Sequence, residues 1–192
     1  MSVRTRIPFQ SGVFFITFTC ADWLPLFKNL NSYDLVYKWF DVLKQAGHAI
    51  HAYVIMPNHL HVLISFKNVG KPINTIVGSG KRFMAYELVK RLQASEAFDI
   101  LHQMNLWVNA TDKKRNKKHE VFEPSFDWKD CSSIDMAIQK LDYIHMNPCC
   151  SKPPLVSDPI QYFYSSANQY MGGNNIIYPV TNIMQMQDFD YR

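Results

Sequence analysis

The sequence is poor in cysteine, in long apolar runs and in any strong excess of one charge. Its four cysteines form no CxxC pair, and we interpret them as reduced thiols rather than a disulfide framework. No apolar run reaches the roughly 18 residues that a membrane span requires. The start of the chain, Met1–Phe9, carries two arginines but no apolar signal core. These absences argue against a secreted or integral membrane protein, and we expect a cytoplasmic one.

What the chain does contain is typical of a globular protein. It has 192 residues, of which 47% are hydrophobic and 19% are charged. The net charge of +4 permits a polyanionic partner without demanding one. Length predicts a single domain, which we assign to residues 1–173, followed by a tail of unknown role over residues 174–192.

The first half of the chain predicts a strand and a helix. Gly12–Cys20 has the aromatic and β-branched content of a strand. Asn31–Ala46 shows helical spacing of its apolar residues, with Ser32 as the expected N-cap and Gly47 as the residue that ends the helix.

A β-hairpin is predicted next, and it contains the residues of greatest interest. The β-rich runs His48–Met56 and His59–Phe66 are separated only by Pro57 and Asn58, which are turn formers. We therefore expect these two strands to pair in an antiparallel way.

The second half predicts further helices and one more strand. Ile73–Leu92 shows helical spacing interrupted by Gly78 and Gly80, and it is followed by an irregular, basic stretch. His119–Phe126 is a candidate fourth strand. The predicted order is strand, helix, hairpin, helix, strand and helix. This order is typical of an α+β protein with a ferredoxin-like split βαβ fold, in which helices pack on a small antiparallel sheet.

A third helix is expected after this strand. Ser132, followed three residues later by Asp135, is a capping signal for a helix that runs to about His145. Asn147 and Pro148 mark its predicted end. The remainder of the chain lacks sustained periodicity, so we expect short helical pieces and an extended tail there.

Two histidines in the second hairpin strand form a His-apolar-His triplet. Because side chains alternate along a strand, His59 and His61 lie on one face and Leu60 lies on the other. Both imidazoles can then reach one divalent ion, with a third ligand supplied from elsewhere. The alternative is that one histidine is merely packed and the other exposed.

The third helix offers two polar groups on one side. Tyr143 falls opposite the apolar stripe, so it is an exposed tyrosine, a packing group or a nucleophile delivered to a site. Asn147 lies one helical turn later on nearly the same face and offers a carboxamide oxygen. Its simpler interpretation is a helix C-terminal residue before Pro148.

Together, these strings resemble a known family. Tyr53–Ile64 reads YVIMPNHLHVLI and Tyr143–Pro148 reads YIHMNP. Shorter segments that also resemble the family occur at Phe14–Thr19, Phe122–Phe126 and Tyr164–Ala167. The combination resembles the single-tyrosine transposases of the HUH endonuclease superfamily, particularly the REP-associated tyrosine transposases of the insertion-sequence transposase type. The resemblance covers most of residues 10 to 170.

The resemblance implies a mechanism and assigns its residues. His59 and His61 would bind Mg²⁺ or Mn²⁺, which polarises the scissile phosphate of single-stranded DNA. Tyr143 would be the catalytic nucleophile, leaving a 5′-phosphotyrosine on the enzyme and a free 3′-hydroxyl. Asn147 matches the position of a third metal ligand. The implied activity is DNA transposition by cleavage and rejoining of single strands.

Other interpretations stay open at this point. A domesticated, non-mobile nucleic-acid-binding protein would keep the same fold without moving an element. A histidine-triad nucleotide hydrolase would need a third histidine two residues further along the strand, where this chain has Leu63. The sequence does not decide whether the DNA forms a hairpin, or whether the protein is a monomer or a homodimer. His51 and His145 are the two candidates for a general base.

DNA contacts are predicted only from charge and aromaticity. The cations that could follow phosphates are Lys81, Arg82, Lys113, Lys114, Arg115, Lys117 and Lys118, with Lys90 and Arg91 nearby. A basic run of this kind is also common in a solvated loop. Trp107 or Trp128 could stack on a base, although tryptophan in a chain of this size more often belongs to the core.

Overall fold

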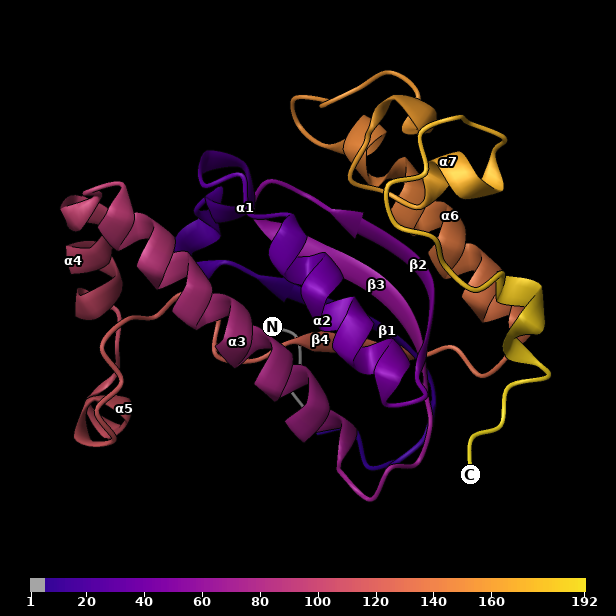
Figure 1. Cartoon of the computed structure of the whole chain (residues 1–192), viewed down its shortest axis with the longest axis horizontal. Coiled ribbons are helices and arrows are strands. Elements are labelled where there is room, and N and C mark those ends of the chain that lie inside the picture. Colours follow the sequence, from indigo (N-terminus) through magenta and orange to yellow (C-terminus); the bar gives the residue numbers. More distant parts are fainter. Residues whose placement is uncertain (1–5) are drawn as a thin grey trace.

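A computed structural model describes residues 6–192. Residues 1–5 lie outside the described part, and they belong to the segment that was expected to lack a signal sequence. The described chain is built on a four-stranded antiparallel sheet in the order β2-β3-β1-β4 (Figure 1). The strands are β1 (Gly12–Thr19), β2 (Ala49–Ile55), β3 (His59–Phe66) and β4 (Asp127–Asp130).

The sheet has the split βαβ arrangement. Strands β1 and β2 both pair antiparallel with β3, which lies between them, so β1 and β2 are parallel to each other. The connection between them runs through helix α2 (Asp34–Gln45). This topology confirms the predicted ferredoxin-like α+β fold.

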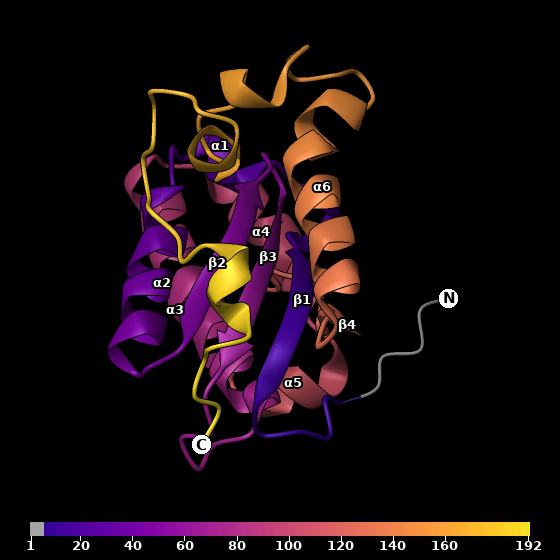
Figure 2. The same ribbon diagram turned by 90° about the vertical axis from the view of Figure 1, so that its right-hand side faces the viewer.

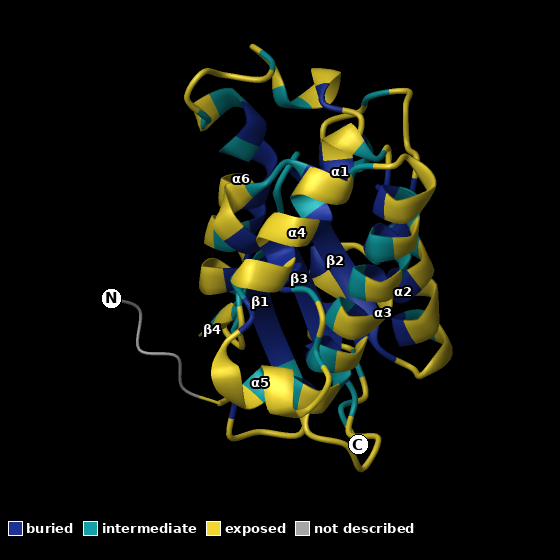
Figure 3. Cartoon of the chain, turned by 90° about the vertical axis from the view of Figure 1, so that its left-hand side faces the viewer, coloured by how far each residue is buried: buried dark blue, intermediate teal, exposed yellow. Residues whose placement is uncertain are grey.

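Helices cover both faces of the sheet. Helices α2 and α3 (Ile73–Ala94) lie on one side, and helix α6 (Ile134–Cys150) lies on the other (Figure 2). Each interface has its own apolar core, and strands β1, β2 and β3 are almost entirely buried between them, whereas the edge strand β4 is mostly exposed (Figure 3). The remaining helices are α1 (Leu26–Asn29), α4 (Phe98–Leu106), α5 (Ala110–Lys114) and α7 (Ala167–Tyr170), with 3₁₀ turns η1 (Ala21–Trp23), η2 (Pro159–Gln161) and η3 (Ile183–Met186).

The first strand and the hairpin match their predictions closely, because their side chains alternate between two buried faces. Phe14, Ile16 and Phe18 join the core under α2 and α3. Val13 and Phe15 join the core under α6. The same alternation decides which side of the sheet carries the candidate site.

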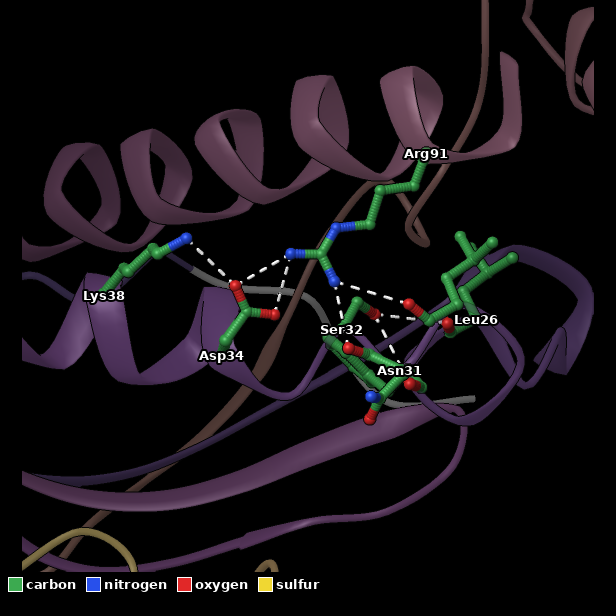
Figure 4. Close-up of polar contacts among 8 residues, drawn as sticks. Leu26, Asn31, Ser32, Asp34, Lys38 and Arg91 are labelled. Atoms are coloured by element: carbon green, nitrogen blue, oxygen red, sulfur yellow. Dashed lines mark hydrogen bonds and ion pairs between the residues drawn. The ribbon is translucent and has the colours of Figure 1, made fainter. Parts of the chain in front are cut away.

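Helix α2 begins later than its sequence predicts, and Ser32 is not its N-cap. The Ser32 hydroxyl donates to the carbonyls of Leu26 and Phe27 instead (Figure 4). The start of the helix is held by Arg91 of α3, whose guanidinium donates to both Asp34 carboxylate oxygens at 2.8 Å. Arg91 therefore joins α3 to α2.

Helix α3 runs without a break through the two glycines that were expected to interrupt it. Gly80 is buried against the ring of Trp39, and a Cβ at this position would lie 2.7 Å from the Trp39 Cδ1 atom. Gly80 thus permits close contact between α3 and α2. It does not end the helix.

The strand predicted at His119–Phe126 is wrong. The segment makes only an isolated bridge between Phe122 and Cys20, and the fourth strand follows it as β4. The carbonyls of Glu123 and Ser125 accept hydrogen bonds from the Lys81 ammonium at 2.7 and 2.8 Å rather than from a neighbouring strand.

Both predicted ends of the third helix are shifted. Ser133, not Ser132, caps α6 by accepting a hydrogen bond from the Met136 amide. The helix then continues through Asn147 and Pro148 to Cys150. Pro148 is buried and its carbonyl accepts from the Leu155 amide, so packing stabilises a proline in the last turn.

The C-terminal segment 174–192 follows the edge of the sheet. The Thr181 amide donates to the Ile50 carbonyl of β2 at 2.8 Å, and the Asn68 amide donates to the Tyr191 carbonyl. The Tyr178 hydroxyl donates to Asp41 on α2. Figure 2 shows this segment in yellow along β2.

The irregular stretch expected after α3 contains the helices α4 and α5. Leu101 and Met104, three residues apart, anchor α4 in the core, and Asn109 caps α5 by accepting from the Asp112 amide. Among all helices of residues 6–192, none has the length and apolar character needed to cross a bilayer.

Candidate active site

His59 and His61 project from β3 toward α6, as the alternation along the strand predicts. Their Nε2 atoms are 3.1 Å apart and their ring centroids are 4.7 Å apart. Leu60 points to the opposite face and is completely buried. The two rings therefore converge on one point beside the helix.

The other ring nitrogen of each histidine is held by a neighbouring side chain. His59 Nδ1 lies 2.7 Å from Asn58 Oδ1, which can only accept, so Nδ1 carries the proton and Nε2 keeps its lone pair. His61 Nδ1 lies 2.6 Å from Thr17 Oγ1, directly across the β1–β3 pair. The threonine hydroxyl can donate or accept, so it is compatible with either tautomer of His61.

Burial keeps both rings neutral. It lowers the pKa of His59 to about 4, although the nearby Asn147 carboxamide opposes the shift. Burial also lowers the pKa of His61 to about 3, with further contributions from His59 and Lys140. At neutral pH both imidazoles therefore have the unprotonated nitrogen that a metal ligand requires.

Tyr143 reaches the same place from α6. Its side chain is 48% exposed and lies off the apolar stripe of the helix, as predicted. Its ring packs edge-on against His61, with centroids 5.3 Å apart, and against Phe15 of β1, with centroids 5.8 Å apart. The flank of α6 that carries Tyr143 therefore borders β1 and β3.

Two more α6 residues lie along this edge. Asn147 lies one helical turn after Tyr143, and its carboxamide is close enough to His59 to affect the pKa of that histidine. The Lys140 ammonium lies 5.3 Å from the centroid of the Tyr143 ring and 5.1 Å from that of Phe15. A positive charge is thus held beside the phenol.

The donor set suits a divalent cation. Two nitrogens bound to one ion at about 2.1 Å and at right angles lie roughly 3 Å apart, which matches the separation of the two Nε2 atoms. Hydrogen bonds to both Nδ1 atoms are the usual outer support of histidine ligands. Within residues 6–192, no group of three His, Cys, Asp or Glu side chains offers an alternative metal site.

The two candidate bases are directed elsewhere. His51 lies between Ser65 Oγ, at 2.7 Å, and the Thr181 carbonyl, at 3.1 Å. His145 is buried on the core side of α6, as its helical position predicts, and its Nε2 lies 2.9 Å from Ser166 Oγ. Neither ring is hydrogen-bonded to Tyr143 in the described chain.

The predicted DNA-contacting cations fall into two groups. Lys81 is bonded to the 123–125 backbone, and Lys117 forms ion pairs with Glu120 and Asp112. These two side chains thus have structural partners. The others are exposed, and they are Arg82, Lys113, Lys114, Arg115 and Lys118.

A pocket brings part of these basic stretches together. It has a volume of about 590 Å³ and lies between α3 and residues 115–124. Arg82, Arg115 and Lys118 line it, together with the exposed ring of Tyr86. Residues 121–123 also pair with the chain just after β1, so the pocket adjoins the end of the sheet that carries His59.

Sequence reasoning missed several residues that surround the site. Thr17, Asn58 and Lys140 each contact one of its members, and Trp23 packs against His59 with centroids 5.9 Å apart. Asn58 was identified only as a turn former. Knowledge of the β1–β3 register would have pointed to Thr17, because it lies directly opposite His61.

Comparison with known proteins supports the fold. No family model and no curated protein matches the chain. A REP-associated tyrosine transposase bound to a REP hairpin is similar in structure, with a TM-score of 0.62 and 16% identity over 93% of this chain and 89% of that chain. A candidate transposase from Deinococcus radiodurans R1 has a TM-score of 0.43 and 16% identity over 73% of this chain and 93% of that chain, too distant to support an argument. The first likeness shows that the chain has the fold of a single-tyrosine, REP-associated transposase.

Proposed function

We propose that the protein is a metal-dependent, HUH-type single-strand DNA endonuclease and transposase that works through a covalent 5′-phosphotyrosine at Tyr143. The observation that carries this proposal is the convergence of Tyr143, His59 and His61 from two separate elements. A phenol beside a pair of neutral imidazoles that can hold a metal ion suits a metal-assisted phosphoryl transfer with tyrosine as nucleophile.

In this proposal, three side chains would form a site for a cation. His59, His61 and Asn147 would hold a divalent ion, Mg²⁺ or Mn²⁺, which when bound would act as a Lewis acid on the scissile phosphate. Asn58 and Thr17 would fix the two histidine rings through their Nδ1 atoms.

Tyr143 would carry out the covalent step. Its phenolic oxygen forms a bond to phosphorus, the bond from phosphorus to the 3′-oxygen breaks, and the 3′-oxygen takes up a proton as the phenol loses one to solvent. The phosphotyrosine keeps the phosphate at the ester level, so a later 3′-hydroxyl can reverse the step and join new ends. Lys140 beside the ring would favour the negative charge that develops there.

The substrate is inferred from the fold and from charge. The similar structure is a transposase bound to a REP hairpin, which supports DNA as the partner of this chain. The exposed cations that line the pocket, Arg82, Arg115 and Lys118, would contact backbone phosphates. Single-stranded DNA is the substrate we propose, as the resemblance to single-tyrosine transposases implies.

The test is a covalent-adduct assay. Single-stranded oligonucleotides from the flanks of the gene, labelled at the 5′ or the 3′ end, are incubated with the full chain in Mn²⁺ or in EDTA. We expect the 3′-labelled fragment to become attached to the protein in Mn²⁺ only. Tyr143→Phe should abolish attachment, whereas the control Tyr191→Phe, in the C-terminal segment away from the site and the pocket, should not.

The negative outcomes differ in meaning. If wild-type protein binds metal and its DNA but forms no adduct, the covalent mechanism is wrong and a binding protein with the same fold is favoured. An adduct that survives Tyr143→Phe would show that another residue is the nucleophile.

A further inference from the structure

Trp23 is exposed directly beside the histidine pair. Its side chain is 64% exposed, and its ring lies edge-to-face with His59, with centroids 5.9 Å apart and planes at 77°. By contrast, Trp39 is buried, and Trp107 and Trp128 are partly buried against the core. Trp23 is therefore the tryptophan of this chain that offers its surface to a ligand.

The backbone at Trp23 is held in an unfavourable conformation. Asp22 and Trp23 have φ values of 50° and 56°, in the left-handed region that residues other than glycine rarely adopt. Neither the positive φ nor the exposure of a large apolar ring favours folding. Strain of this kind persists where the surrounding structure enforces it, and it concentrates at functional sites.

Asn58 is the side chain that connects Trp23 to the site. Its Nδ2 atom donates to the Trp23 carbonyl at 3.2 Å, while its Oδ1 atom accepts from His59 Nδ1 at 2.7 Å. The Cys20 amide also donates to the Asn58 carbonyl at 2.8 Å, which anchors the same turn. One residue thus orients both the histidine and the turn that carries the indole.

We propose that Trp23 is a stacking platform for an unpaired nucleobase of the strand whose phosphate lies at His59 and His61. This inference rests on the proposed function for the identity of the strand. A flat, exposed indole stacks on any base because every base has a π-face, whereas the bases of a duplex are already stacked on one another. Trp23 would therefore select single-stranded DNA and hold the nucleotide beside the site in a fixed position.

Fluorescence of the full chain tests the proposal without any chemistry. A short oligo(dT) strand is added in EDTA, and we expect it to quench part of the tryptophan emission. Trp23→Phe should remove that quenching yet keep the affinity within about threefold, because phenylalanine still stacks. Trp23→Ala should weaken binding by about tenfold, as expected for the loss of one base–aromatic stack.

A matched control uses another exposed aromatic residue. Phe98 on α4 is 62% exposed, and Phe98→Ala should change neither affinity nor quenching. A blunt duplex of the same length should quench the Trp23 component far less than the single strand. Equal affinity of wild type and Trp23→Ala would overturn the proposal, as would a Trp23→Ala variant that changes only the oligomeric state.

The outcomes separate this inference from the proposed function. If Trp23 is quenched by single strands but no covalent adduct forms, the stacking inference stands and the nuclease proposal fails. If adducts form equally well in wild type and Trp23→Ala, with no Trp23 quenching, the nuclease proposal stands and the stacking inference fails. In the first case, Tyr143→Phe should leave the quenching intact.

Discussion

Replacing Thr17 with valine is expected to weaken metal binding without disturbing the fold. Valine has nearly the same shape as threonine but cannot hydrogen-bond, so His61 Nδ1 loses the partner that now lies 2.6 Å away. A metal bound at Nε2 requires the proton on Nδ1, and in the variant that buried N–H would have no acceptor.

The size of the effect follows from that lost acceptor. An unsatisfied buried donor costs about 1–3 kcal/mol, and loss of an outer-shell partner of a histidine ligand typically lowers metal affinity about 10- to 100-fold. The two figures agree, since tenfold corresponds to about 1.4 kcal/mol. We therefore expect Thr17→Val to raise the dissociation constant for Mn²⁺ by at least about tenfold.

Isothermal titration of Mn²⁺ into the purified chain measures the change. Thr19→Val is the matched control, because Thr19 lies opposite His59 in the same strand pair while His59 Nδ1 is bonded to Asn58. Thr17→Ser, which restores a hydroxyl, should recover most of the affinity. Unchanged Mn²⁺ affinity in Thr17→Val, with Thr17→Ser no different, would refute the role given to this hydrogen bond.

Three further predictions concern packing, pH and charge. Gly80→Ala should destabilise the protein by about 1–3 kcal/mol because its Cβ would overlap Trp39, whereas Gly78→Ala, with open space around it, should be neutral or stabilising in chemical denaturation. Burial lowers the pKa of His51, so the unfolded state takes up a proton first and stability falls as pH drops below about 6.5. In urea titrations below that pH, His51→Gln should reduce the loss of stability. Lys140→Met should slow single-turnover adduct formation by about tenfold or more while oligonucleotide affinity changes less.

Sequence patterns were sufficient wherever a local period decided the structure. Alternation along β3 placed His59 and His61 on one face with Leu60 opposite, and helical spacing put His145 in the core. The order of elements also gave the split βαβ fold. In each case burial on a known face is specified by neighbours within a few residues, so one sequence contains the information.

Contacts between distant segments were not predictable in this way. The failed strand at 119–126 depends on Lys81, which is about forty residues away and takes the carbonyls that a strand would have paired. Pro148 was expected to end α6 because proline disfavours a helix at the preceding residue. Its burial, which stabilises it within the helix, could not be foreseen. Likewise, the sequence correctly placed Tyr143 off the apolar stripe of its helix. Only the packing of α6 on the sheet shows that this side of the helix contacts His61.

The most direct test of the account identifies the residue that carries the DNA. Wild-type protein is incubated in Mn²⁺ with its single-stranded substrate, the DNA is digested with nuclease, and the peptides are analysed by mass spectrometry. We predict that the remaining nucleotide is attached through its 5′-phosphate to the peptide containing Tyr143. Attachment to another tyrosine, or DNA cleavage without any modified peptide, would contradict the central claim.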